Sequence, residues 1–235
     1  MPRNINPVNN LELQRLKAVN KYLLFNVNKE IEGIAKLTSF LTNKPIALIT
    51  LIDSDEQIIL ASEGVELKRM PRATSFCNHA IEQNELMVVE DASKDDRFKN
   101  LPVVTGEFNI RFYASTNLVS DDGYNIGTLC VYDVKPNTFN KQEKEHLVLL
   151  AKQVNHVLEL NKQLSLAVQN NEALTKIAWT CAHELNAPLS SILGMVDLIK
   201  TNHFNFDLNH LKQLEDAAIQ LDEVVSKVIK TTNRV

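Results

Sequence analysis

Glycine and proline are scarce in this chain of 235 residues, which contains 6 Gly and 7 Pro. Their scarcity excludes collagen-like, low-complexity and proline-rich disordered proteins. The 3 cysteines, Cys77, Cys130 and Cys181, form an odd set without the spacing of metal ligands. We therefore expect reduced thiols in a cytoplasmic protein and no metal site. The hydrophobic content of 44% is enough for the core of one or two domains.

Long hydrophobic runs are also missing. The longest, at residues 46–52, has the length of a strand, and no run approaches the roughly 18 residues of a membrane span. The first ten residues lack the apolar centre of a signal peptide. The net charge of -4 gives no reason to expect nucleic acid or an anionic membrane as a partner.

The first part of the chain, up to about residue 140, alternates helix and strand patterns. Two stretches repeat apolar residues at helical spacing, and five have the composition of strands. The helical stretches are 11–25 and 31–41, and the strands are 46–53, 57–64, 87–90, 114–119 and 126–134. Asp122 and Gly123 separate the last two strands, and Gly tolerates the positive φ of a hairpin turn. The patterns predict an α+β domain in which helices flank an antiparallel sheet.

From Lys141 onward the strand signals vanish and a long helix is expected. Apolar, small and amide residues follow one heptad register, in its a and d positions. They are Leu147, Leu150, Val154, Val157, Asn161, Leu164, Val168, Asn171, Thr175, Ala178, Ala182, Leu185, Leu189, Ile192, Val196 and Ile199. A helix of this length runs about 80 Å, more than a small domain can cover, so a parallel homodimer is predicted. The alternative is a helix packed on its own globular domain.

A second helix is predicted after Asp207, which is a suitable N-cap. Its apolar residues keep the same spacing: Leu211, Leu214, Ala218, Leu221, Val225 and Val228. Two such helical hairpins from two chains would form a dimeric four-helix bundle. We expect a tail at 1–10, a sensor domain at 11–160, a coiled-coil signalling helix at 141–180 that overlaps the end of this domain, and the dimerisation hairpin at 175–235.

His183 is the residue best suited to chemistry on the long helix. In the heptad register His183 and Glu184 point away from the seam, where an outside partner could reach them. A largely neutral imidazole is nucleophilic, and a neighbouring carboxylate can hold its tautomer and accept a proton. Pro188 removes one helical hydrogen bond nearby. A zinc protease motif is excluded because Ala187 stands where the second His is needed.

The stretch HELNAPLSSILGMVDLI at residues 183–199 resembles the phosphoacceptor motif of the dimerisation domain of histidine kinases. The resemblance implies that His183 accepts the phosphoryl group, that Glu184 is the acidic catalytic neighbour, and that Pro188 kinks the helix. Asn186 and Ala187 depart from the family pattern. Ala187 replaces a Thr or Asn that orients water, so efficient phosphatase activity is not expected.

The first part of the chain resembles a GAF domain. The segments that carry the resemblance are RLKAVNKYLL, PIALITLID, SFCNHAIEQNELMVVEDASKDDRF and DDGYNIGTLCVYD. The resemblance implies a six-stranded antiparallel sheet and a pocket for a small ligand. Residues expected to line it are Phe76, Cys77, His79, Arg111 and Tyr113. The motif for cyclic nucleotides is absent and Asn78 follows Cys77 where bilin-binding members have His, so neither ligand is expected. Cys130 is expected to be structural.

The kinase resemblance also implies an ATP-binding domain, and no Gly-rich phosphate loop occurs here. We expect no cofactor on this chain and no ATP turnover by it alone. ATP and Mg²⁺ would act through a kinase domain in a longer chain or in trans. The expected function is a cytoplasmic two-component sensor whose partners are a second copy, that kinase domain and the receiver domain of a response regulator. The alternative is a non-catalytic GAF module with a dimerising helical scaffold.

Overall fold

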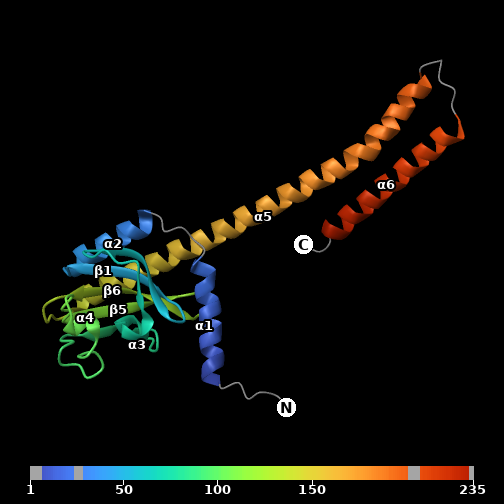
Figure 1. Cartoon of the computed structure of the whole chain (residues 1–235). Helices are drawn as coiled ribbons and strands as arrows, with labels where there is room; N and C mark the ends of the chain where they lie inside the picture. The colour runs from blue at the N-terminus through green and yellow to red at the C-terminus, as the bar shows by residue number, and fades with distance from the viewer. Residues whose placement is uncertain (1–6, 24–28, 201–206, 233–235) are drawn as a thin grey trace, which may run out of the picture. The chain divides into compact units, whose positions relative to one another are not determined.

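The computed structural model describes residues 7–23, 29–200 and 207–232 (Figure 1). It divides into two compact units, Met1–Ser165 and Leu166–Val235. Each is described by itself. Helix α1 (Pro7–Leu23) begins inside the stretch 1–10 that the sequence assigns to a tail.

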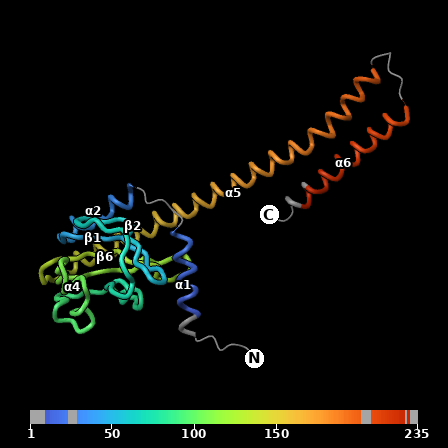
Figure 2. The backbone as a smooth tube through the Cα atoms, in the orientation of Figure 1, coloured from blue at the N-terminus to red at the C-terminus, as the bar shows by residue number. Residues whose placement is uncertain are grey.

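The first unit is built on an antiparallel sheet. Within the described ranges its six strands lie in the order β3-β2-β1-β6-β5-β4. They are β1 (Ile46–Ile52), β2 (Glu56–Glu63), β3 (Arg69–Pro71), β4 (Met87–Val89), β5 (Phe112–Val119) and β6 (Asn125–Asp133). Figure 2 traces the backbone of this unit and labels β1, β2 and β6. The expected six-stranded antiparallel sheet with helices is therefore confirmed. Strand β3 is not predicted, because its sequence Arg-Met-Pro contains a proline and lacks the β-branched apolar residues that predict the equally short β4.

Two glycines fit the sheet for different reasons. Gly123 has a φ of 82° in the turn between β5 and β6, as the Asp-Gly pair predicts. Gly127 lies on β6, where an added Cβ would stand 1.9 Å from the carbonyl oxygen of Thr50 on β1. The two central strands thus approach at a point where no side chain fits.

Successive side chains of a strand point to opposite faces of the sheet, and the central strands are apolar on both faces, so each face carries its own core. Ala47, Ile49 and Leu51 of β1 face the first core, and Leu48 and Ile52 face the second. The first core is completed by α1, α2 (Lys29–Thr42) and the start of α5 (Lys141–Lys200). The second contains α3 (Phe76–Ala80) and α4 (Pro102–Thr105), with the short helix η1 (Arg72–Thr74) before them.

The start of α5 is covered by its own domain. Leu147, Val154 and Leu158 are almost completely buried in the first core. The prediction that a partner helix covers the seam from Leu147 onward is therefore wrong for this part, and the alternative of a helix on its own domain holds here. The physical reason is that the face of the sheet that carries the first core must be shielded from water. The apolar stripe at the start of α5 packs on this face. Further along α5, Leu164 is 65% exposed.

The second unit contains the end of α5 and helix α6 (Leu208–Thr232). Asp207 caps α6 as predicted, because its Oδ1 accepts hydrogen bonds from the backbone N–H groups of Asn209 (2.9 Å) and His210 (3.1 Å). Large apolar side chains stay exposed on both helices, including Leu174 and Leu211. The dimeric bundle remains a prediction. No helix among the described residues combines the length and apolarity that crossing a bilayer requires.

Candidate functional site

The second face of the sheet contains a small apolar cavity of about 50 Å³. Its walls come from β1, β3, α3, α4, β6 and the loops between them. The lining residues are Ile46, Leu48, Val65, Leu67, Met70, Phe76, Val103, Phe108, Ile110 and Tyr132. Such a cavity suits a small apolar group and offers almost no polar partner to a charged ligand.

The five residues that are predicted to line the pocket lie at different places relative to the cavity. Phe76 lines the cavity, and Tyr113 stacks on it with ring centroids 4.8 Å apart. Cys77 is fully buried and is not one of the residues that line the cavity. His79 makes an edge contact with the ring of Phe98. Only Phe76 of the five is a lining residue.

Arg111 has a structural role in the described chain. Its guanidinium donates hydrogen bonds to the backbone carbonyls of Val104 (2.9 Å) and Ile110 (3.0 Å), and to the side chain of Asn109. These bonds satisfy carbonyl groups in the loop that leads into β5. Arg111 therefore holds this loop in place and does not line the cavity.

Cys77 and Cys130 contact each other next to the wall of the cavity. Their Sγ atoms are 3.7 Å apart, and both residues are completely buried. The hydroxyl of Tyr113 donates to Cys77 Sγ at 3.3 Å. The hydroxyl oxygen of Tyr132 lies 3.5 Å from the same sulfur and 3.7 Å from Cys130 Sγ. This cluster could not be predicted from the sequence, because the two cysteines are far apart along the chain.

Glu12 links α1 to the short helix η1. Its carboxylate accepts hydrogen bonds from Arg15 Nε at 2.7 Å and from an Arg72 nitrogen at 2.6 Å. The bonds from Arg15 and Arg72 outweigh partial burial and lower the pKa of Glu12 to about 2. A carboxylate with a depressed pKa stabilises the fold above its unfolded pKa, and this stabilisation disappears as the pH falls toward the folded pKa.

A Glu12→Gln variant tests this contribution. At pH 7 we expect a loss of about 1 kcal/mol in the free energy of unfolding, a small value because the side chain is partly exposed. The difference from the parent chain should shrink between pH 4.5 and pH 2, where Glu12 becomes protonated. Urea unfolding at a series of pH values measures it. A difference that stays constant down to the lowest accessible pH would contradict this assignment.

His183 lies exposed on α5 in the second unit. The ring of Trp179, one turn earlier, lies with its centroid 5.4 Å from the imidazole centroid. Pro188 is buried, and α5 continues through it without a break. An exposed imidazole beside an aromatic ring can be reached by an incoming domain.

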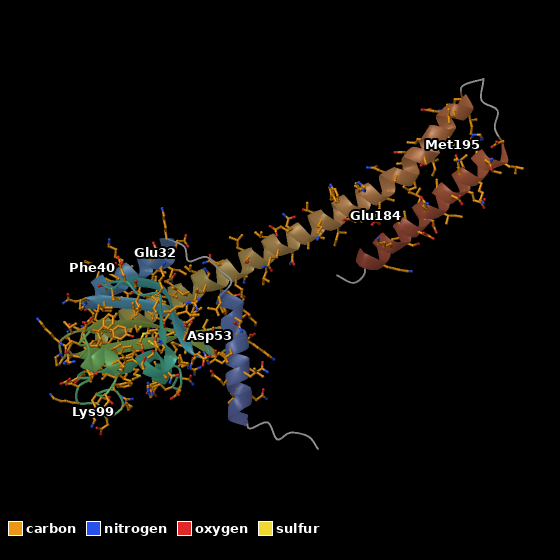
Figure 3. All side chains as sticks on the ribbon, in the orientation of Figure 1. Glu32, Phe40, Asp53, Lys99, Glu184 and Met195 are labelled. Atoms are coloured by element: carbon orange, nitrogen blue, oxygen red, sulfur yellow. The ribbon has the colours of Figure 1, made fainter. Side chains whose placement is uncertain are left out.

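Glu184 has a partner on α6 that the sequence did not suggest. Figure 3 labels Glu184 on α5. Lys227 Nζ donates to both carboxylate oxygens of Glu184, at 2.9 and 3.0 Å. Glu184 is therefore half-buried toward α6, whereas the heptad register predicts that it points away from the seam. The physical reason is that the antiparallel α6 brings a cation against this side of the helix. Within the described ranges, His, Cys, Asp and Glu residues nowhere form a group of three or more that could hold a metal.

The fold and the cavity define a small sensor-type α+β domain. A family model described as GAF domain matches residues 28–158, more than half of the chain. The chain therefore belongs to the GAF domain family. The matched range ends before the helical hairpin that carries His183.

A curated relative is a cyclic di-GMP phosphodiesterase of Pseudomonas aeruginosa. It is 35% identical over 167 residues, which cover 63% of this chain and 28% of the relative. The chain thus spans little more than a quarter of that protein. The activity in the relative's name belongs to the relative.

Several solved structures are similar to part of this chain. They include the GAF domain of a phosphoenolpyruvate-protein phosphotransferase from Acinetobacter (TM-score 0.49, 18% identity, 66% of this chain and 94% of that one). The free methionine-R-sulfoxide reductase of Neisseria meningitidis has a TM-score of 0.49 at 19% identity, over 66% of this chain and 87% of that one. A domain of a putative two-component sensor histidine kinase from Sinorhizobium meliloti 1021 has a TM-score of 0.46 at 18% identity, over 60% of this chain and 96% of that one. At these scores the likenesses carry no argument about function.

Proposed function

We propose that this chain is the sensory and phosphoacceptor part of a cytoplasmic two-component signalling protein. In this proposal the GAF domain takes up a small ligand or a partner. Its state controls whether the ATP-binding domain of a kinase can reach His183. The phosphoryl group then passes to an aspartate of a response regulator. The observation that carries the proposal is the exposed imidazole of His183 on a helical hairpin, next to a carboxylate.

The phosphoryl transfer would use two side chains of this chain, His183 and Glu184. An imidazole nitrogen of His183 would attack the γ-phosphorus of ATP as the bond to the ADP oxygen breaks. The ring proton must pass to a base, and Glu184 is the adjacent candidate. Because Lys227 binds both oxygens of Glu184, the carboxylate must leave this exposed ion pair at least in part. Exposed pairs are worth about 0–1 kcal/mol, so this release costs little.

A cluster around Lys162 supports a connection between the sensor domain and α5. Lys162 is 7% exposed, and its Nζ lies 2.7 Å from carboxylate oxygens of both Asp121 and Glu159. Its ammonium also lies 5.1 Å from the ring centroid of Tyr22. Burial opposes the charge, but the two carboxylates raise the pKa of Lys162 above its usual value. One cation thus joins α1, the β5–β6 turn and α5.

A Lys162→Met variant should loosen this junction. We expect a loss of about 1–3 kcal/mol in the free energy of unfolding, because two carboxylates lose their cation while remaining partly solvated. Backbone amides of α5 near residue 162 should exchange with deuterium faster than in the parent chain. Lys152→Met, which changes an exposed lysine of the same helix, is the matched control. Equal exchange in both variants would contradict the proposed junction.

The second candidate function is a GAF module whose helical hairpin serves only as a dimerising scaffold for another output. The relative that is named as a phosphodiesterase favours it, because a related domain there accompanies a different activity. The two functions differ in whether the chain can be phosphorylated.

Incubation of the full chain with γ-labelled ATP and the ATP-binding domain of a histidine kinase tests the first function. We expect acid-labile, alkali-stable label on the chain, on the peptide that contains His183. If several kinase domains leave every peptide unlabelled, or if the label is on a hydroxyl side chain, the scaffold function is favoured.

A further inference from the structure

Cys77 and Cys130 lie side by side in the second core. Cys77 lies on α3 and Cys130 on β6, and tertiary packing brings their Sγ atoms to 3.7 Å. A disulfide has sulfurs about 2.0 Å apart, so the two sulfurs must come closer to form the bond.

The surroundings make the two thiols different. Burial raises the pKa of Cys77, but hydrogen bonds from Cys130 and from the hydroxyls of Tyr113 and Tyr132 outweigh it and lower the pKa below that of a free thiol. Burial and the neighbouring Cys77 raise the pKa of Cys130 well above its usual value. Cys77 is thus the better nucleophile, and Cys130 keeps its proton.

The cavity offers a small molecule a way toward the pair. Tyr132 lines the cavity and its hydroxyl oxygen contacts Cys77 Sγ. Phe76, which precedes Cys77 in α3, lines it too. The side chain of Tyr132 therefore lies both at the cavity wall and against the sulfur of Cys77.

We propose that Cys77 and Cys130 form a redox-active dithiol that a hydroperoxide converts into a disulfide. The Cys77 thiolate attacks one peroxide oxygen, the O–O bond breaks, and the departing oxygen takes a proton to leave as water or an alcohol. Cys77 is then a sulfenic acid. The Cys130 sulfur attacks the sulfur of Cys77, the S–O bond breaks, and water leaves with the proton of Cys130. Two thiols lose two electrons, which reduce one peroxide.

Bond formation would change the cavity as well as the sulfurs. Phe76 lies next to Cys77 and its ring stacks on Phe98 (4.6 Å) and Tyr113. Drawing Cys77 toward β6 shifts this stack at the cavity wall. The dithiol therefore links the oxidation state of the GAF domain to the shape of its cavity, independently of any chemistry at His183.

The test uses the full chain with Cys181→Ser, which removes the partly exposed third thiol. The reduced, folded protein is treated with hydrogen peroxide, denatured, alkylated and digested for mass spectrometry. We expect a peptide pair joined through Cys77 and Cys130 and lighter by two hydrogen atoms. It should form at least about tenfold faster than in protein oxidised in denaturant, because folding holds the sulfurs together.

Two further variants identify the roles of the sulfurs. With Cys130→Ala in the same background, the sulfenic acid on Cys77 should persist and be trapped by dimedone. With Cys77→Ala, Cys130 should react with peroxide at least about tenfold more slowly, since its thiol stays protonated. Circular dichroism checks that both variants fold. Absence of the linked peptide in the folded reference protein, or its equally rapid formation in denaturant, would overturn the proposal.

Discussion

A His183→Gln variant is expected to lose all acid-labile label in the phosphotransfer assay. Gln has a similar size and fits an exposed helical position, so the fold should not change. It has no ring nitrogen that can form the N–P bond. The measurement compares the label on the parent chain with the label on the variant, using the same kinase domain.

Two comparisons make this result specific. His156→Gln changes another exposed histidine of α5 and should keep full labelling. Glu184→Gln keeps the shape of the side chain but cannot take the proton, so it should slow labelling by about 10²-fold or more. Label retained on His183→Gln would reject His183 as the acceptor. Unchanged labelling of Glu184→Gln would remove only Glu184 from the mechanism.

A Gly127→Ala variant is expected to lose several kcal/mol of folding free energy. The new Cβ would stand 1.9 Å from the carbonyl oxygen of Thr50 and 2.9 Å from the Cα of Leu51. Both are backbone atoms of the neighbouring central strand, so no side chain can rotate away. The strands β1 and β6 must separate and lose hydrogen bonds, at a cost above the usual range of about 0.5–3 kcal/mol for single substitutions.

Gly123→Ala provides the matched comparison. It also adds one methyl group, but nothing lies within 4 Å of the new Cβ and only the positive φ is strained. A loss of about 1–2 kcal/mol is expected. Urea unfolding of both variants measures the two losses. Similar losses would show that backbone conformation, rather than the close approach of the strands, limits these positions.

Local patterns were sufficient for much of the fold. The two apolar runs on either side of the polar turn at residues 54–56 predict the β1–β2 hairpin, and Gly123 predicts the turn between β5 and β6. The cap at Asp207 was also readable, because an N-cap depends on backbone groups only two and three residues away. The cavity was not readable in this way. Of the predicted lining residues only Phe76 lines it, since the other walls are ordinary apolar residues of distant strands and loops.

The heptad register likewise predicts local structure but not tertiary contacts. It marks an apolar stripe on α5 correctly, since Leu147 and Val154 are buried. It does not say what covers the stripe, and at these residues the sheet of the same domain does so.

The sequence by itself therefore determined the longer helices, most of the strands, the turn at Gly123 and the histidine motif on the long helix. Only the tertiary structure decided that Cys77 meets Cys130, that Lys227 binds Glu184, and that the sheet covers the start of α5. The physical reason is the range of the interactions. Turns, caps and periodicity act over a few residues, whereas these contacts join segments tens of residues apart, whose meeting depends on strand register and packing of the whole unit.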